Sequence, residues 1–498
     1  MRGEMTEGPA IPTPLATVTW ISAAESKESA PAEIVVEFVA PASNRPDVEI
    51  PGDPRGRWQL CVDRHAGDAR SGDGIADPGK PWRAAGATLI HALVEHAARR
   101  SADGVDIVLP ADVDDPSAEA LVIGLVAGSH ELRLSGSAEE RHLPHVRLVS
   151  ERDVSSAVRR GNVLGRATAF ARDLANLPSN LKSPRGLAEY ARSALTSVSL
   201  DIRVRDEGWL SDRGFGGVLA VGGGSCEPPR LIEISWAPPE SESEQLPHVV
   251  LVGKGITFDT GGISVKPAAN MHLMKTDMAG GAAVLAAVSA IADLAPRVRV
   301  TALVPSAENM LSGSAYRPGD VVTHYGGLTT EVSNTDAEGR MVLADALAYA
   351  VEELAPDVLI DIATLTGAMK VALGMRTGAV FTADTALDSA IRNSGSAVGE
   401  RWWRLPLSEE HADAVQSTIA DLRQAPGGPG AITAALFLKE FAGDSRWVHL
   451  DIAGPARAED AYDEVNPVAS GFGARTLTTF VEWCAQNVKP SRMLPSQP

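Results

Sequence analysis

Apolar residues recur along the chain at two spacings. Short apolar runs such as Val249–Val252 and Val358–Ala363 have the length of buried strands, whereas Ala279–Leu294 repeats its apolar residues at helical spacing. From about residue 180 onward, strands and helices alternate regularly, which predicts a mostly parallel mixed sheet covered by helices on both faces. The other elements expected here are Gly186–Leu195, Met341–Leu354 and Ile432–Phe441 as helices and Leu231–Trp236, Val298–Val304, Val380–Ala383 and Val448–Ala453 as strands.

The first 150 residues show the same alternation. Strands are expected at Glu33–Ala40, Gly104–Pro110 and His145–Ser150, and helices at Ala84–Ala98 and Ser117–Leu134. A long helix follows, and Pro178 stops it. We therefore expect an α/β protein of two domains, with a flexible leader over 1–30, a smaller N-terminal α/β domain over 31–152, a linker helix over 153–180 and a larger domain over 181–498.

Composition narrows the class of protein. The 498 residues are 44% hydrophobic and 22% charged, as in ordinary globular proteins, and the net charge of −19 argues against nucleic-acid binding driven by overall charge. Three widely spaced cysteines argue against a disulfide framework or a cysteine zinc site. We find neither an apolar signal segment nor an apolar run of about 18 residues, so a cytoplasmic protein without a membrane span is expected.

One polar motif lies where a loop is expected to enter a helix. Asn334–Met341 places Asp336, Glu338 and Arg340 two residues apart, and in an extended or turning backbone such residues point to one side. They could therefore converge on one cavity. Taken alone, the two carboxylates are better explained as the acidic first turn that many helices have.

A second polar stretch follows the expected strand Val249–Val252. Lys254, Asp259, Lys266 and Asp277 occur among glycines, in loops at the carboxyl end of that strand, where open α/β sheets place their ligand sites. Alone, Lys254 would be read as an ion-pairing or phosphate-contacting lysine. Four carboxylates in the two stretches together form an oxygen-rich set that suits divalent cations such as Mn²⁺, Mg²⁺ or Zn²⁺.

Together the two motifs resemble those of a leucyl aminopeptidase of the cytosol aminopeptidase family, a two-metal peptidase, and the resemblance extends over about residues 160–485. It implies that 181–498 is the catalytic domain. Asp259 and Glu338 would bridge two divalent cations, and Lys254 could ligate only after losing its proton, which burial and nearby dications favour. The implied metal ligands are Lys254, Asp259, Asp277, Asp336 and Glu338.

The resemblance also implies a reaction. Lys266 would polarise the scissile carbonyl, and Arg340 would hold a bicarbonate that acts as general base on a metal-bridging water. The expected activity is release of the N-terminal residue of peptides, with leucine-like residues preferred, by a homohexamer built as a dimer of trimers. Met274 would line the pocket for the first side chain, although core packing explains it equally well. The other implied substrate contacts are Thr364, Leu365 and Gly367.

Three other classes of function compete with this hypothesis. A DNA-binding regulator is possible for this family, but the net charge opposes it. A scaffold without activity would not be expected to keep the complete set of charged residues. A two-metal phosphoesterase would also use carboxylates, but it does not explain Lys254.

Overall fold

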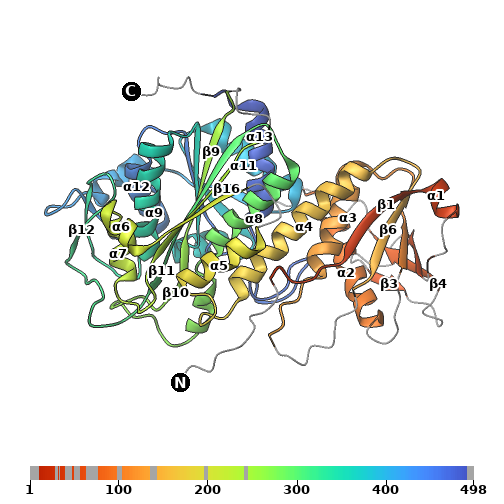
Figure 1. Cartoon of the computed structure of the whole chain (residues 1–498), viewed down its shortest axis with the longest axis horizontal. Helices are drawn as coiled ribbons and strands as arrows, with labels where there is room; N and C mark the ends of the chain where they lie inside the picture. Colours follow the sequence, from red (N-terminus) through yellow and green to blue (C-terminus); the bar gives the residue numbers. More distant parts are fainter. Residues whose placement is uncertain are drawn as a thin grey trace. The chain divides into compact units, whose positions relative to one another are not determined.

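The computed structural model describes residues 11–28, 32, 34–39, 47–49, 56–62, 77–97, 104–134, 143–195, 200–239 and 245–490. The chain packs as two compact units, each built around its own sheet (Figure 1). The first comprises Met1–Asp173, Ser396–Gly399 and Ala458–Pro467, and the second comprises Leu174–Gly395, Glu400–Arg457 and Val468–Pro498. Two short segments from the second half of the chain thus belong to the first unit.

The first unit contains a six-stranded sheet in the order β1-β6-β5-β2-β4-β3. Every neighbouring pair is parallel except β3 with β4. Helices α2 (Lys80–Ala97) and α3 (Asp115–Gly128) pack together and close its core. The strands are β1 (Thr17–Ser22), β2 (Ile34–Val39), β3 (Asp47–Glu49), β4 (Gly56–Cys61), β5 (Gly104–Val108) and β6 (His145–Ser150).

The expectation of a flexible leader up to residue 30 is wrong for its described part. Strand β1 pairs in parallel with β6, from Thr17 opposite His145 to Ser22 opposite Ser150, and helix α1 (Ala23–Glu28) follows it. A partner more than a hundred residues away supplies the hydrogen bonds that this strand cannot make alone. Helix α4 (Ser155–Asn176) contains the point at which the chain passes from the first unit to the second.

The second unit contains a nine-stranded sheet in the order β16-β15-β18-β14-β9-β11-β8-β7, with β10 also paired to β11. The pairs formed by β9, β10, β11, β14 and β18 with one another are parallel, whereas β7, β8 and the β15–β18 pair run antiparallel. The predicted mixed, mostly parallel sheet is confirmed. Its strands are β7 (Asp201–Arg205), β8 (Arg230–Trp236), β9 (His248–Gly253), β10 (Gly255–Asp259), β11 (Arg299–Asn309), β14 (Val358–Ala363), β15 (Thr377–Phe381), β16 (Arg401–Arg404) and β18 (Trp447–Asp451).

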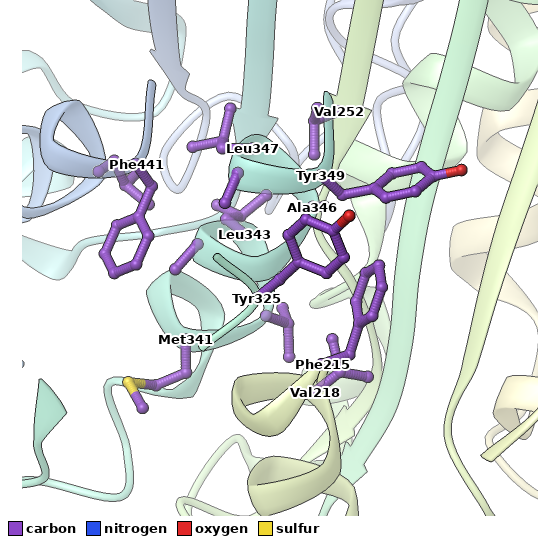
Figure 2. Close-up of a cluster of buried hydrophobic side chains, with 14 of the residues drawn as sticks. Phe215, Val218, Val252, Tyr325, Met341, Leu343, Ala346, Leu347, Tyr349 and Phe441 are labelled. Atoms are coloured by element: carbon purple, nitrogen blue, oxygen red, sulfur yellow. The ribbon is translucent and has the colours of Figure 1, made fainter. Parts of the chain in front are cut away.

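Helices α8 (Ala279–Leu294) and α9 (Glu338–Tyr349) both pack on the central strands β9, β11 and β14. All residues of β9 are buried, so both faces of this strand are covered. Val250 and Val252 belong to the core under α9, where Figure 2 shows Val252 near Leu347 and Tyr349. Helix α9 therefore has its apolar body in this core while its first turn begins at the polar edge of the sheet.

Several smaller elements complete the second unit, and a three-stranded sheet in the order β12-β13-β17 lies outside the main one. The sequence pattern missed these strands because each has only two or three residues. Helix α9 continues as a π-helix over Ala350–Leu354, and there are two 3₁₀ helices, η1 (Met271–Thr276) and η3 (Glu409–Val415). The short strands are β12 (Val321–Thr323), β13 (Thr329–Glu331) and β17 (Leu422–Arg423). The other helices are α5 (Pro184–Ala194), α6 (Glu207–Asp212), α7 (Gly216–Gly222), α10 (Gly367–Leu373), α11 (Thr385–Val398), α12 (Gly430–Ala442) and α13 (Ala474–Asn487).

Contrary to the expectation of no long apolar run, Met271–Leu294 is long and apolar enough to cross a membrane by length and composition alone. Its most apolar window is 78% buried inside the protein. Because α8 packs on the central strands and against α13, its apolar character is that of a core helix.

Candidate metal and active site

The polar residues singled out in the sequence gather at the carboxyl ends of the central strands. Lys254 directly follows β9, and Asp259 is the last residue of β10. Asp277 lies between η1 and α8, and Glu338 is the first residue of α9. Because neighbouring parallel strands end at the same edge, loops far apart in sequence deliver their side chains to one place.

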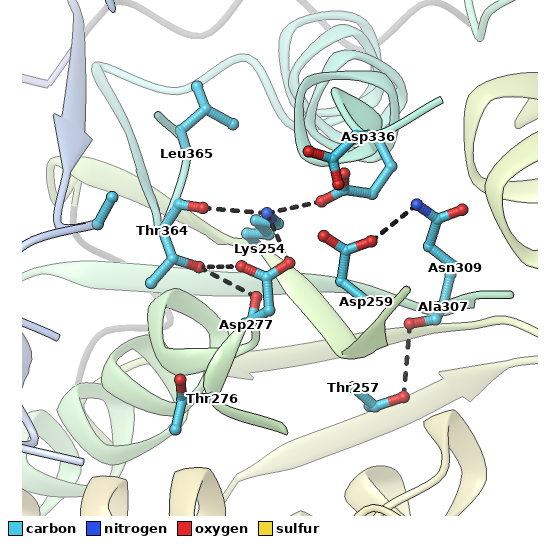
Figure 3. Close-up of polar contacts among 12 residues, drawn as sticks. Lys254, Thr257, Asp259, Thr276, Asp277, Ala307, Asn309, Asp336, Thr364 and Leu365 are labelled. Atoms are coloured by element: carbon cyan, nitrogen blue, oxygen red, sulfur yellow. Dashed lines mark hydrogen bonds and ion pairs between the residues drawn. The ribbon is translucent and has the colours of Figure 1, made fainter. Parts of the chain in front are cut away.

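The Lys254 ammonium is buried and contacts three oxygens. Its Nζ lies 2.8 Å from Asp277 Oδ2, 2.8 Å from Glu338 Oε1 and 3.0 Å from the carbonyl oxygen of Thr364, to which it donates (Figure 3). Thr364 in turn donates from Oγ1 to Asp277 Oδ1 at 2.8 Å. The ammonium thus has two carboxylates and one carbonyl oxygen around it, and the lysine ties α9 to the loop after β14.

Lys266 joins the other two carboxylates. Its Nζ lies 2.7 Å from Asp259 Oδ2 and donates to Asp336 Oδ1. The second oxygen of Asp259 accepts from the backbone N–H of Gly261 and from Asn309 Nδ2, each at 2.8 Å. Lys266 and Asp336 are the more exposed members of the cluster, at 21% and 34% of their side-chain surface. Their side of the cluster is therefore the one open to a reactant.

Asp259, Asp336 and Glu338 each offer an oxygen, and these three oxygens lie within 4.8 Å of one another. The backbone is packed tightly around them: a Cβ added to Gly339 would lie 2.6 Å from Lys254 Cε. A larger residue at this position would therefore require the Lys254 side chain to shift. Glu338 also lies at the positive end of the α9 dipole, which favours its negative charge.

Burial makes the charges of this cluster costly. Burial and the neighbouring Glu338 charge raise the pKa of Asp259 to about 6, although both lysines oppose the rise. Burial likewise raises the pKa values of Asp277 and Glu338. For Lys254, burial alone would lower the pKa, but the carboxylates of Asp277 and Glu338 outweigh it and raise the pKa above its usual value. The residues by themselves therefore favour an ammonium, not the neutral amine expected for a metal ligand.

The donor set fits divalent cations. Its carboxylates outnumber its two lysines by two, and Glu338 Oε2 is buried without a hydrogen-bond partner among the described residues. Carboxylate oxygens are the ligands preferred by Mg²⁺ and Mn²⁺ and are common for Zn²⁺. Cations placed here would neutralise the excess charge and occupy the unsatisfied oxygen. The structure joins all five expected ligands into one cluster, with Asp277 connected to the other carboxylates through Lys254.

Arg340 follows Glu338 on the first turn of α9 and is buried. Its Nη1 donates to the carbonyl oxygen of Gln424 at 2.7 Å, and its Nε is buried without a hydrogen-bond partner among the described residues. Burial lowers the pKa of the guanidinium to about 10, while Glu338 and Asp451 oppose the decrease. The side chain therefore stays cationic at neutral pH and has donor capacity left for a small anion.

The four expected substrate contacts belong to the loop after β14, the start of α10 and η1. Thr364 touches the charged cluster directly, and Leu365, the next residue, packs partly against the large core of the second unit. Gly367 begins α10. Met274 lies in η1, and its carbonyl oxygen accepts from the N–H of Asp277, so its backbone supports a ligand candidate.

Four buried polar residues of the site were not predicted: three lie outside the motifs in sequence, and the fourth, Thr335, lies within Asn334–Met341 but carries no charge. Asn309 ends β11 and donates to Asp259 and to the Thr335 carbonyl oxygen. Asp451 accepts from the backbone N–H groups of Leu365 and Thr366 and thereby holds the loop after β14. The other two are Thr335, which donates to the Gly261 carbonyl oxygen at 2.7 Å, and Gln424.

The fold and the site define an α/β protein with an acidic metal-binding cluster at the carboxyl edge of its sheet. The model of the cytosol aminopeptidase family, catalytic domain, matches residues 169–478. A probable cytosol aminopeptidase of Roseiflexus castenholzii is 48% identical over 327 residues, which cover 65% of this chain and 66% of that protein. A probable cytosol aminopeptidase of Solibacter usitatus is 42% identical over 402 residues, which cover 80% of this chain and 83% of that protein.

A solved structure extends the likeness to three dimensions. The bottromycin maturation enzyme BotP, in complex with Mn, superimposes with a TM-score of 0.79 at 34% identity, covering 91% of this chain and 100% of that one. The chain belongs to the cytosol aminopeptidase family, a family of metalloexopeptidases. The match spans about two thirds of the length of the Roseiflexus relative.

Proposed function

We propose that this protein is a metal-dependent aminopeptidase that hydrolyses the N-terminal peptide bond of peptides and prefers leucine-like first residues. The observation that carries the proposal is the buried cluster in which carboxylates outnumber lysines at the carboxyl edge of the sheet. Its position within the region matched by the family's catalytic domain supports it, and so does the manganese complex of BotP. The catalytic domain would then comprise residues 181–498, with the N-terminal domain before it.

The proposed cofactors are two divalent cations per subunit, Mn²⁺, Zn²⁺ or Mg²⁺. Asp259 and Glu338 would be shared between them, Asp277 and Lys254 would complete one site, and Asp336 the other. When bound, such cations act as Lewis acids that polarise a carbonyl group and lower the pKa of water. Lys254 would have to give up a proton on ligation, and the cations supply the positive charge that its ammonium otherwise provides.

Two cationic side chains would complete the reaction centre. Lys266 stays protonated and lies on the more exposed side, where it could donate to the developing oxyanion. Arg340 would hold a bicarbonate as general base, which its unpartnered Nε and its charge at neutral pH support. The loop Thr364–Gly367, with Met274, would contact the substrate, and the free α-amine would be recognised at the metal cluster.

The proposal extends to the setting of the enzyme: a cytoplasmic homohexamer, a dimer of trimers, acting in peptide turnover. Mass photometry of the purified protein tests the assembly, for which a monomer as the main species would be the contrary result. Some members of the family also bind DNA. The net charge of −19 is unfavourable for that role, and a salt-dependent gel shift tests it.

The activity is tested with purified protein and Mn²⁺ on leucyl p-nitroanilide and on the same compound with an acetylated amine. We expect hydrolysis of the first compound only, and loss of that hydrolysis after chelation. Binding of two cations without hydrolysis of any aminoacyl anilide would overturn the proposed activity. Hydrolysis of both compounds would contradict recognition of the free amine.

A further inference from the structure

We propose that Gln424 is a positioning residue that fixes the loop carrying Asp336 and Glu338 and sets the place of Arg340 relative to them. The inference rests on the metal site of the proposed function. Gln424 is fully buried and immediately follows β17. It is 88 residues from Asp336 in sequence, so nothing in the motif Asn334–Met341 points to it.

Strand pairing brings Gln424 to the loop. Strand β17 runs parallel to β13, with Thr330 opposite Leu422 and Glu331 opposite Arg423. The register is continued by the backbone N–H of Gln424, which donates to the Glu331 carbonyl oxygen at 3.0 Å. The side chain of Gln424 is therefore placed against the residues that follow β13, and these residues lead directly to Asp336.

The side-chain amide of Gln424 spans this loop from one side to the other. Its Oε1 accepts from the backbone N–H groups of Ser333 and Asn334, both at 3.1 Å, and its Nε2 donates to the carbonyl oxygen of Ala337, also at 3.1 Å. Only Thr335 and Asp336 lie between these attachment points. An amide is suited to this task because it accepts and donates at the same time.

Other hydrogen bonds hold the middle of the loop, where the carbonyl oxygen of Thr335 accepts from Asn309 and Tyr316. Ser333 and Asn334 are exposed, and their side chains form hydrogen bonds, from Ser333 Oγ to the Ala425 carbonyl oxygen and from the N–H of Asp336 to Asn334 Oδ1. Thr335 anchors the middle of the loop to the Gly261 carbonyl oxygen from the β10 side. Gln424 holds both flanks, including Ala337 immediately before Glu338. Without it, the positions of both carboxylates would be less well defined.

The backbone of Gln424 reaches the third member of the motif. Its carbonyl oxygen accepts from Arg340 Nη1 at 2.7 Å, the one hydrogen bond of that guanidinium among the described residues. A single residue thus bonds to the segment before Asp336, to the residue before Glu338 and to Arg340. Removing a group that orients metal ligands in this way commonly lowers metal affinity or activity by roughly 10- to 100-fold.

The test compares Mn²⁺ affinity, measured by calorimetry on the full-length protein, in Gln424→Met and Gln416→Met. Gln424→Met keeps the length of the side chain and removes the amide, and Gln416→Met changes an exposed glutamine earlier in the same segment. We expect Gln424→Met to weaken Mn²⁺ binding about 10- to 100-fold and Gln416→Met to leave it unchanged. Thermal melting of the metal-free proteins is recorded in parallel.

If Gln424→Met does not fold, Gln424→Asn takes its place, because it keeps an amide that is too short to span the loop. A folded variant that binds Mn²⁺ as tightly as the wild type would overturn the inference, even with a lowered melting temperature, because the residue would then serve stability alone. Wild-type protein that binds no Mn²⁺ would instead overturn the proposed metal site, so the two failures are distinguishable.

Discussion

The two units of the chain both contain a mainly parallel sheet, and an ion pair in the first contrasts with the charged cluster in the second. In the first unit, Asp106 of β5 is paired with Arg147 of β6, whose Nε and Nη2 donate at 2.6 and 3.1 Å. One acid meets one base, and the charges cancel. In the second unit, four carboxylates share two lysines, and Glu338 keeps a buried oxygen without a hydrogen-bond partner among the described residues.

The difference shows that a candidate functional site requires more than the arrangement of strands in a sheet. Parallel strand ends are present in both sheets, so topology alone does not create the cluster. In the second unit, glycines such as Gly261 and Gly339 let the backbone pack closely around ionisable side chains. A balanced pair serves folding, whereas an unbalanced cluster is destabilising until a ligand completes it.

The largest expected effect comes from removing one of the carboxylate charges that exceed the lysine charges in the cluster. Glu338→Gln should lower Mn²⁺ affinity at least about 100-fold and the peptidase rate on the order of 1,000-fold, because it removes one proposed shared ligand. The metal-free protein should stay folded, since a buried charge is lost. Calorimetry and an anilide assay measure this, with Glu352→Gln, an exposed glutamate just after α9, as the control. If Glu338→Gln bound Mn²⁺ with unchanged affinity, the excess carboxylates of the cluster would not serve metal binding, and the cluster would not differ in purpose from the Asp106–Arg147 pair.

The core beneath α9 tests whether stability and metal binding are separable in the second unit. Leu347 is fully buried, and Leu347→Ala should lower the free energy of unfolding by about 3 kcal/mol, through lost burial and a cavity. Mn²⁺ affinity should hold, because Leu347 lies about two and a half turns from Glu338. Urea unfolding measures the free energy of unfolding. Val371→Ala, at a side chain 88% exposed, should change it by less than about 0.5 kcal/mol. A comparable loss in both variants would contradict the assignment of this core.

Protons should compete with cations for the carboxylates of the cluster. The raised pKa of Asp259, about 6, means that a proton must leave this carboxyl below pH 6 before a cation binds, so affinity should rise with pH there. Above pH 6 the rise should continue at about tenfold per pH unit, because Lys254 must also lose a proton to ligate. Calorimetry from about pH 5 to pH 9 measures this. A plateau above pH 6 would mean that Lys254 remains an ammonium.

The smallest effect is expected in the first unit. Asp106→Asn should cost about 1 kcal/mol of stability, because Arg147 loses a charged and partly buried acceptor. It should leave Mn²⁺ affinity unchanged. Asp115→Asn is the control, since Asp115 pairs with Arg152 at an exposed position and such pairs contribute little. A clear loss of Mn²⁺ binding in Asp106→Asn would mean that the two units do not bury charge for separate purposes.

Much of the fold followed from patterns within single segments. The apolar run of β9 and the helical spacing of α8 were recognisable because burial on both faces requires continuous apolar sequence. Short strands such as β12 and β17 were not, since their stability comes from their neighbours. Strand β1 was taken for a leader, because only pairing with β6 makes it a strand.

For the site, the sequence determined the chemistry: which carboxylates, lysines and arginine are available, and that they follow strand ends among glycines. Their meeting in one buried cluster, with Lys254 held as an ammonium, was decided by the tertiary structure. So were the parts played by Asn309, Asp451 and Gln424, whose partners lie far away in the chain. The physical reason is that a hydrogen bond or an ion pair depends on distance in space, which the order of residues specifies only once the sheet has formed.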